Sequence, residues 1–124
     1  MRIFKIFDSN CSVCEEMSHY DSEVVLSLAY PERKIEYRTR ELGVILDPDS
    51  ENPDDATLAH YAEVYAVNPD YTIDLPVYFV LEGKKYLGHL VGEQSRDELR
   101  AKLEGIVSGA SNSKSKDCLL YTSP

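Results

Sequence analysis

The stretch Arg2-Ile-Phe-Lys-Ile-Phe-Asp-Ser-Asn-Cys-Ser-Val-Cys14 decides the fold of this chain. Its first part, from Arg2 to Asp8, is rich in Ile and Phe, as is typical of a β-strand. Ser9 and Asn10 follow, and both residue types favour the position just before a helix. The stretch therefore predicts a strand, a tight turn and a helix that opens with a Cys-x-x-Cys pair.

The rest of the chain continues this alternation of strands and helices. Apolar residues recur at helical spacing up to Tyr30, where Pro31 predicts the end of the first helix, and Asn52 and Pro53 mark the start of the second. The predicted elements are a helix over 12–30, a strand over 34–42, a polar loop over 43–55, a helix from 53, a β-hairpin over 75–91 and a last helix with a Ser95–Glu98 capping box. This order, βαβαββα, predicts an α/β fold.

Length and charge narrow the class of protein. The 124 residues suit one domain, and 13 Lys and Arg against 22 Asp and Glu leave a net charge of −9. Nucleic acid is therefore not an expected partner, because its binding requires a basic surface. No apolar run approaches the roughly 20 residues of a membrane span, and the first residues lack a signal peptide's apolar stretch. We expect a cytoplasmic monomer.

The C-terminal residues differ from the rest in composition. We expect the folded domain to cover residues 1–107, and residues 108–124 to form a disordered tail, because Ser108 to Lys116 are small and polar with nothing to bury. The last seven residues, Cys118 to Pro124, resemble a translated sequencing adapter. On that hypothesis Cys118 is not a natural residue.

Cys11 and Cys14 predict redox chemistry. Only the thiolate attacks a disulfide, and the N-terminus of a helix can lower the pKa of a thiol from ~8.5 toward 7 or below. Three residues' separation on a helix brings the two sulfurs close enough to pair. We expect Cys11 to be the nucleophile and Cys14 the resolving thiol, with no cofactor besides their disulfide.

Two other interpretations of the pair remain open, a purely structural role and half of a zinc site. Zinc requires two further ligands, and His19, His60 and His89 lack a second short-spaced pair. In the acidic loop, Asn52 stands where a calcium-binding loop has its turn glycine. We therefore expect no metal.

The segments RIFKIFDSNCSVC (2–14) and DLPVYFVLEGKKYLGHLVGEQSRDELRAKLEGI (74–106) resemble the two halves of a thioredoxin. The resemblance implies the thioredoxin fold, with a central four-stranded mixed sheet flanked by helices. It implies reduction of protein disulfides, with a thioredoxin-reductase-type protein as electron donor. It also implies that Pro76 is cis and faces the cysteines, that Leu75 offers backbone groups to substrate, and that Gly92 floors the groove.

The chain departs from the thioredoxin pattern at the motif itself. Ser12 and Val13 replace Gly-Pro, and Asn10 replaces the flanking Trp, so the family's redox potential cannot be carried over. Lys5 stands where the family keeps a buried carboxylate. If Lys5 points inward it favours the thiolates; the alternative is that its ammonium group reaches solvent at the edge of the sheet.

Two alternative functions remain. One is a glutaredoxin-like, glutathione-dependent reductase, although Asp8, Ser9 and Asn10 offer no cation for glutathione and Gly88-His89 replaces that family's double glycine. The other is a non-catalytic binding module with a thioredoxin fold. The intact Cys11/Cys14 pair argues against it, because binding alone requires neither sulfur.

Overall fold

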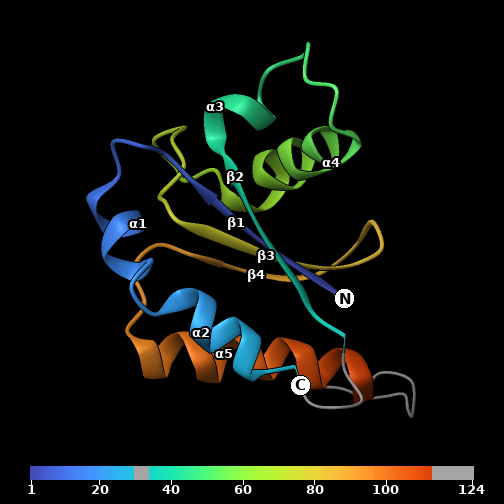
Figure 1. Ribbon diagram of the computed structural model, residues 1–124. Helices are drawn as coiled ribbons and strands as arrows, with labels where there is room; N and C mark the ends of the chain where they lie inside the picture. The colour runs from blue at the N-terminus through green and yellow to red at the C-terminus, as the bar shows by residue number, and fades with distance from the viewer. Residues whose placement is uncertain (30–33, 113–124) are drawn as a thin grey trace.

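A four-stranded mixed sheet forms the centre of the molecule (Figure 1). The computed structural model describes residues 1–29 and 34–112. The strands are β1 (Arg2–Phe7), β2 (Glu36–Glu41), β3 (Val77–Glu82) and β4 (Lys85–Val91), and their order is β2-β1-β3-β4. β1 and β2 are parallel, whereas β3 is antiparallel to both β1 and β4. The predicted α/β fold with a mixed four-stranded sheet is confirmed.

Helices cover both faces of the sheet. In Figure 1, α2 (Asp21–Ser27) and α5 (Arg96–Asn112) lie on one face, and α3 (Leu42–Ile45) and α4 (Pro53–Tyr61) lie on the other. The short helix α1 (Ser12–Met17) leads into α2, and a π-helical turn, η1 (Ala62–Ala66), follows α4. None of the helices in the described ranges is both long and apolar enough to cross a membrane.

The strands divide their side chains between two cores. Ile3 and Val80 pack with α2 and α5, whereas Phe4, Ile6 and Phe79 belong to the core beneath α3 and α4. This division follows from the two-residue period of a strand, which sends successive side chains to opposite faces. By the same period Lys5 lies on the face that α2 covers, so its amine is directed into the protein and not toward an edge.

The segment after the cysteines forms two short helices instead of the single helix predicted over 12–30. The backbone N–H of Ser18 donates to the carbonyls of Cys14 and Glu15, which closes α1 at Met17. Farther on, the hydroxyl of Tyr20 donates to the carbonyl of Gln94, and the side chain of Asp21 turns into the core. These tertiary contacts offset the loss of helical hydrogen bonds at the break. The predicted end at Tyr30–Pro31 lies outside the described residues.

The predicted loop over 43–55 is more ordered than expected. Its first residues belong to α3, because Ile45 is buried in the core under α4. The start of α4 is as predicted, with the Asn52 side chain accepting from the N–H of Asp54 at 2.9 Å. Asp55 is 1% exposed and accepts two hydrogen bonds from Arg40, both 2.8 Å long, so this carboxylate is not solvated.

This ion pair predicts a pH dependence of stability. The hydrogen bonds from Arg40 hold the pKa of Asp55 below its ordinary value, so its contribution is present above about pH 4 and is lost as pH falls through the lowered pKa. We expect Asp55→Asn to unfold at lower urea than the wild type at pH 7, and the difference to shrink below about pH 4. The exposed Asp49→Asn is the control. A difference independent of pH would contradict the assignment.

The C-terminal helix begins as predicted and ends later. Ser95 and Glu98 exchange both hydrogen bonds of a capping box, at 3.0 and 3.2 Å. The helix α5 continues to Asn112, past residue 107, where we expected the folded domain to end. Val107 is fully buried and Ser108 donates to Glu104 one turn back, so the helix retains both packing and polar contacts beyond the boundary. Residues 113–124, with the expected disordered tail and Cys118, lie outside the described residues.

Candidate active site

A tight turn joins β1 to α1 and carries the first cysteine. The backbone N–H of Cys11 donates to the carbonyl of Asp8 at 3.0 Å, and the Asp8 carboxylate accepts from the N–H of Asn10 at 3.1 Å. Cys11 itself occupies the N-cap position, so Ser9 and Asn10, the predicted caps, belong to the turn. The turn therefore places the first sulfur at the start of the helix.

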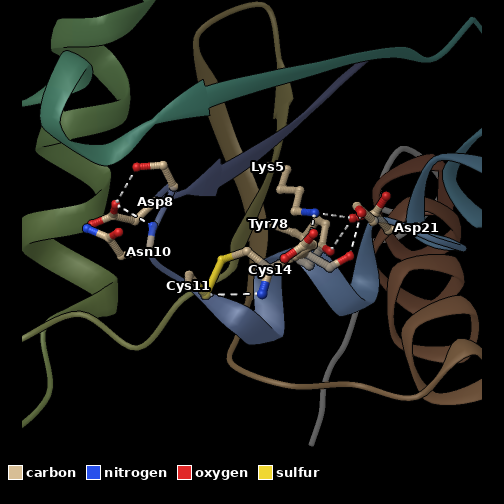
Figure 2. Close-up of a disulfide and its surroundings, with 10 residues drawn as sticks. Lys5, Asp8, Asn10, Cys11, Cys14, Asp21 and Tyr78 are labelled. Atoms are coloured by element: carbon tan, nitrogen blue, oxygen red, sulfur yellow. Dashed lines mark hydrogen bonds and ion pairs between the residues drawn. A yellow bond between two sulfur atoms is a disulfide. The ribbon is translucent and has the colours of Figure 1, made fainter.

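Cys11 and Cys14 form a disulfide, with their Cα atoms 5.2 Å apart (Figure 2). The two residues differ in burial: Cys14 is 3% exposed, whereas Cys11 is only partly buried. The backbone N–H of Cys14 also points at the Sγ of Cys11, 3.1 Å away. The outer sulfur is thus the one that a second molecule can reach, and it already receives a hydrogen bond.

The segment around Pro76 lies at the same end of the sheet. The Leu75–Pro76 peptide bond is cis, as the resemblance implies, and the carbonyl of Pro76 accepts from the N–H of Gly92 at 2.9 Å. Gly92 has a φ of +84°, which favours glycine. Since Val77 pairs with Ile6, Pro76 lies beside the end of β1, where the chain enters the Cys11 turn.

Lys5 is buried beneath the disulfide. Its Nζ donates to the backbone carbonyl of Cys14 at 2.9 Å and to Oδ2 of Asp21 at 2.5 Å. The hydroxyl of Tyr78, the residue paired with Lys5 across the sheet, donates to the same Asp21 oxygen at 2.9 Å. Figure 2 shows this chain of contacts running from the disulfide into the protein. Of the two orientations open to Lys5, the structure has the inward one.

The sequence interpretation missed Asp21 and Tyr78. The signal for Asp21 is its place in the run Cys14, Met17, Asp21, Val24 and Leu28, whose spacing of three and four residues defines one face of a helix. A carboxylate in the middle of an apolar face requires a buried partner. Lys5 is unusual in the same way, because it is a lysine on the inward face of a buried strand and also requires a buried partner.

Burial raises the pKa of the tyrosines around this ion pair. Desolvation, followed by the charge of Asp21, raises the pKa of Tyr78 and of Tyr37. Both phenols therefore stay protonated across the physiological range, and Tyr78 remains a hydrogen-bond donor. The hydroxyl of Tyr37 is buried with no hydrogen-bond partner in the part of the chain that the structure describes.

A pocket of about 390 Å³ opens beside the disulfide. Its lining comprises Lys5, Phe7, Asp8, Ser9, Cys11, Cys14, Glu15, Ser18 and Thr39. Among these residues Lys5 is the only cation, opposed by the carboxylates of Asp8 and Glu15. The predicted site residues therefore fall into two groups. Lys5, Cys11 and Cys14 line this pocket, whereas Leu75, Pro76 and Gly92 do not.

The described residues give no support for the zinc interpretation. Within 1–29 and 34–112, no three His, Cys, Asp or Glu side chains lie together in a way that could hold a metal ion. His89 is instead hydrogen-bonded to the hydroxyl of Tyr86, at 2.6 Å from Nδ1. Burial lowers the pKa of His89.

Comparison with known proteins identifies the fold. Thioredoxin 1 from Thermosipho africanus TCF52B superposes with a TM-score of 0.54 over 90% of this chain and 99% of that protein, at 15% identity. The oxidised thioredoxin from Plasmodium falciparum superposes with a TM-score of 0.53 over 84% and 78% of the two chains, at 13% identity. No protein-family model and no curated protein matches the sequence. The chain therefore has the thioredoxin fold.

Proposed function

We propose that this protein is a thiol–disulfide oxidoreductase that reduces disulfides of client proteins in the cytoplasm. The observation that carries the proposal is the disulfide between a partly exposed Cys11 at the start of α1 and a buried Cys14 one turn later. An accessible sulfur can attack a client, and a shielded sulfur can react only with its neighbour. A dithiol reductase requires these two roles, an attacking sulfur and a resolving sulfur.

The first step belongs to Cys11. In the reduced protein its thiolate attacks one sulfur of the client disulfide, which forms a mixed disulfide and releases the other client sulfur as a thiolate that takes up a proton from solvent. The backbone N–H of Cys14, which points at Sγ of Cys11, stabilises the negative charge of the attacking thiolate. Cys11 is therefore the nucleophile.

The second step belongs to Cys14. Its thiol loses a proton, its sulfur attacks Sγ of Cys11, and the mixed disulfide breaks to release the second client thiolate, which is protonated in turn. Two electrons have then passed from the cysteine pair to the client, the two client sulfurs have each taken up a proton from solvent, and the Cys11–Cys14 disulfide has formed. A thioredoxin-reductase-type protein would return the pair to the reduced state.

Leu75, Pro76 and Gly92 are the proposed client-binding residues. The hydrogen bond between Gly92 and Pro76 joins the segments before β3 and after β4 into one surface at the end of the sheet. The half-buried Leu75 side chain packs against the core under α4, which leaves its backbone as the group available to an extended client segment.

Insulin reduction by dithiothreitol tests the proposal. We expect the wild type to accelerate the precipitation of insulin chains, and Cys11→Ser to give only the rate of dithiothreitol alone, because without the nucleophile no mixed disulfide forms. All variants carry Cys118→Ser, so that the pair supplies the only thiols. No acceleration by a wild type whose two thiols titrate freely would overturn the proposal. Activity only with glutathione and glutathione reductase would indicate the glutathione-dependent reductase instead.

A further inference from the structure

In the buried ion pair beneath the disulfide, the lysine lies nearer to the cysteines than the aspartate does. Lys5 is the member that touches the active site, since its Nζ lies 2.9 Å from the carbonyl oxygen of Cys14. Asp21 contacts the far side of that ammonium group and is held there by the hydroxyl of Tyr78. Lys5 and Asp21 are 4% and 2% exposed, so solvent screens neither charge effectively. The pair thus presents its positive end to Cys14.

We propose that Lys5 and Asp21 are positioning residues that stabilise the negative charge forming on the sulfur of Cys14 when it resolves the mixed disulfide. This inference rests on the proposed dithiol function. Cys14 is 3% exposed, and a thiolate at a buried position is unfavourable without a compensating charge. Asp21 acts through Lys5, because its carboxylate accepts a hydrogen bond from the ammonium group and fixes that group in place.

The other charged groups around Cys14 oppose its ionisation. Asp8 and Glu15 line the same pocket, and Glu16 follows on α1. Tyr78 and Tyr37 remain neutral because their pKa values are raised. Of the charged side chains that line this pocket, Lys5 is therefore the one that favours the Cys14 thiolate. The pocket that Lys5 shares with both cysteines connects Cys14 to solvent, which receives the proton that the thiol releases.

The test is the pKa of Cys14, measured in a Cys11→Ser, Cys118→Ser background by thiolate absorbance at 240 nm. We expect Lys5→Met to raise this pKa by about one unit or more, roughly a tenfold loss of thiolate at neutral pH. Lys5→Met/Asp21→Asn should raise it by less, because the opposing carboxylate is also removed. Lys5→Arg, which keeps the charge, should return it close to the starting value.

This order of pKa values distinguishes electrostatic positioning from a structural role. If Lys5→Met does not fold, the double variant carries the test, since it leaves no unpaired buried charge. An unchanged or lowered Cys14 pKa in the double variant would overturn the inference. The titration requires no client and no turnover, so its outcome is independent of whether insulin is reduced.

Discussion

Cys14→Ser should accumulate as a covalent complex with its client. Without the resolving thiol the reaction stops after the first step, because no sulfur can attack Sγ of Cys11 from inside the protein and release the client. Cys14 is buried, and serine is close to cysteine in size and leaves no large cavity there, so the fold should persist. Non-reducing electrophoresis after incubation with a disulfide-bonded client should show a band that dithiothreitol removes.

The matched control for trapping is Cys11→Ser. This variant retains Cys14, which is 3% exposed and out of reach of a client, so it should give no complex. Both variants carry Cys118→Ser, because a thiol elsewhere in the chain could form mixed disulfides of its own. Trapping by Cys11→Ser and not by Cys14→Ser would reverse the roles assigned to the two cysteines.

Breaking the buried ion pair should cost more stability than any change at the surface. Lys5→Met removes the cation that neutralises the buried Asp21 carboxylate and leaves it the neutral Tyr78 hydroxyl as a partner. A broken buried pair costs about 3–5 kcal/mol. This is a large fraction of the roughly 5–15 kcal/mol that stabilises a typical domain. Urea unfolding followed by circular dichroism measures the change.

Two further variants give this prediction its controls. Lys5→Met/Asp21→Asn removes both charges and should recover most of the loss, because the penalty arises from an unpaired charge. Arg38→Met breaks the ion pair with Glu36 on β2, where both side chains are more than half exposed, and should change the free energy of unfolding by about 0.5 kcal/mol or less. Equal losses in Lys5→Met and in the double variant would show that packing, and not charge, sets the cost.

The two charges beneath the disulfide have consequences for both stability and chemistry. A strand lysine and a helix aspartate occupy faces that are otherwise apolar, and each is tolerated only because the other neutralises it. The positive end of the pair is directed at the cysteine that must ionise in a buried site. Stability measurements and thiol titrations on the same variants can therefore separate the two effects.

Local signals in the sequence predicted most of the fold. The Ile- and Phe-rich segment of β1, the Asn52 cap and the Ser95–Glu98 capping box each involve residues close together in the chain. Their preferred conformations arise from backbone sterics and from hydrogen bonds over a few residues, so they can be recognised before the fold is known. The Cys11/Cys14 pair belongs to the same class, since its spacing alone brings the sulfurs together.

The sequence by itself thus determined the order of the elements, the fold class and the cysteine pair. Only the tertiary structure decided the direction of Lys5, the break between α1 and α2, and the extension of α5 beyond residue 107. The contacts that accompany the first two are distant in sequence: Asp21 lies 16 residues from Lys5, and Gln94 lies 74 residues from Tyr20. A buried charge takes the position that its counter-charge allows, and that position exists only once strand and helix have packed together.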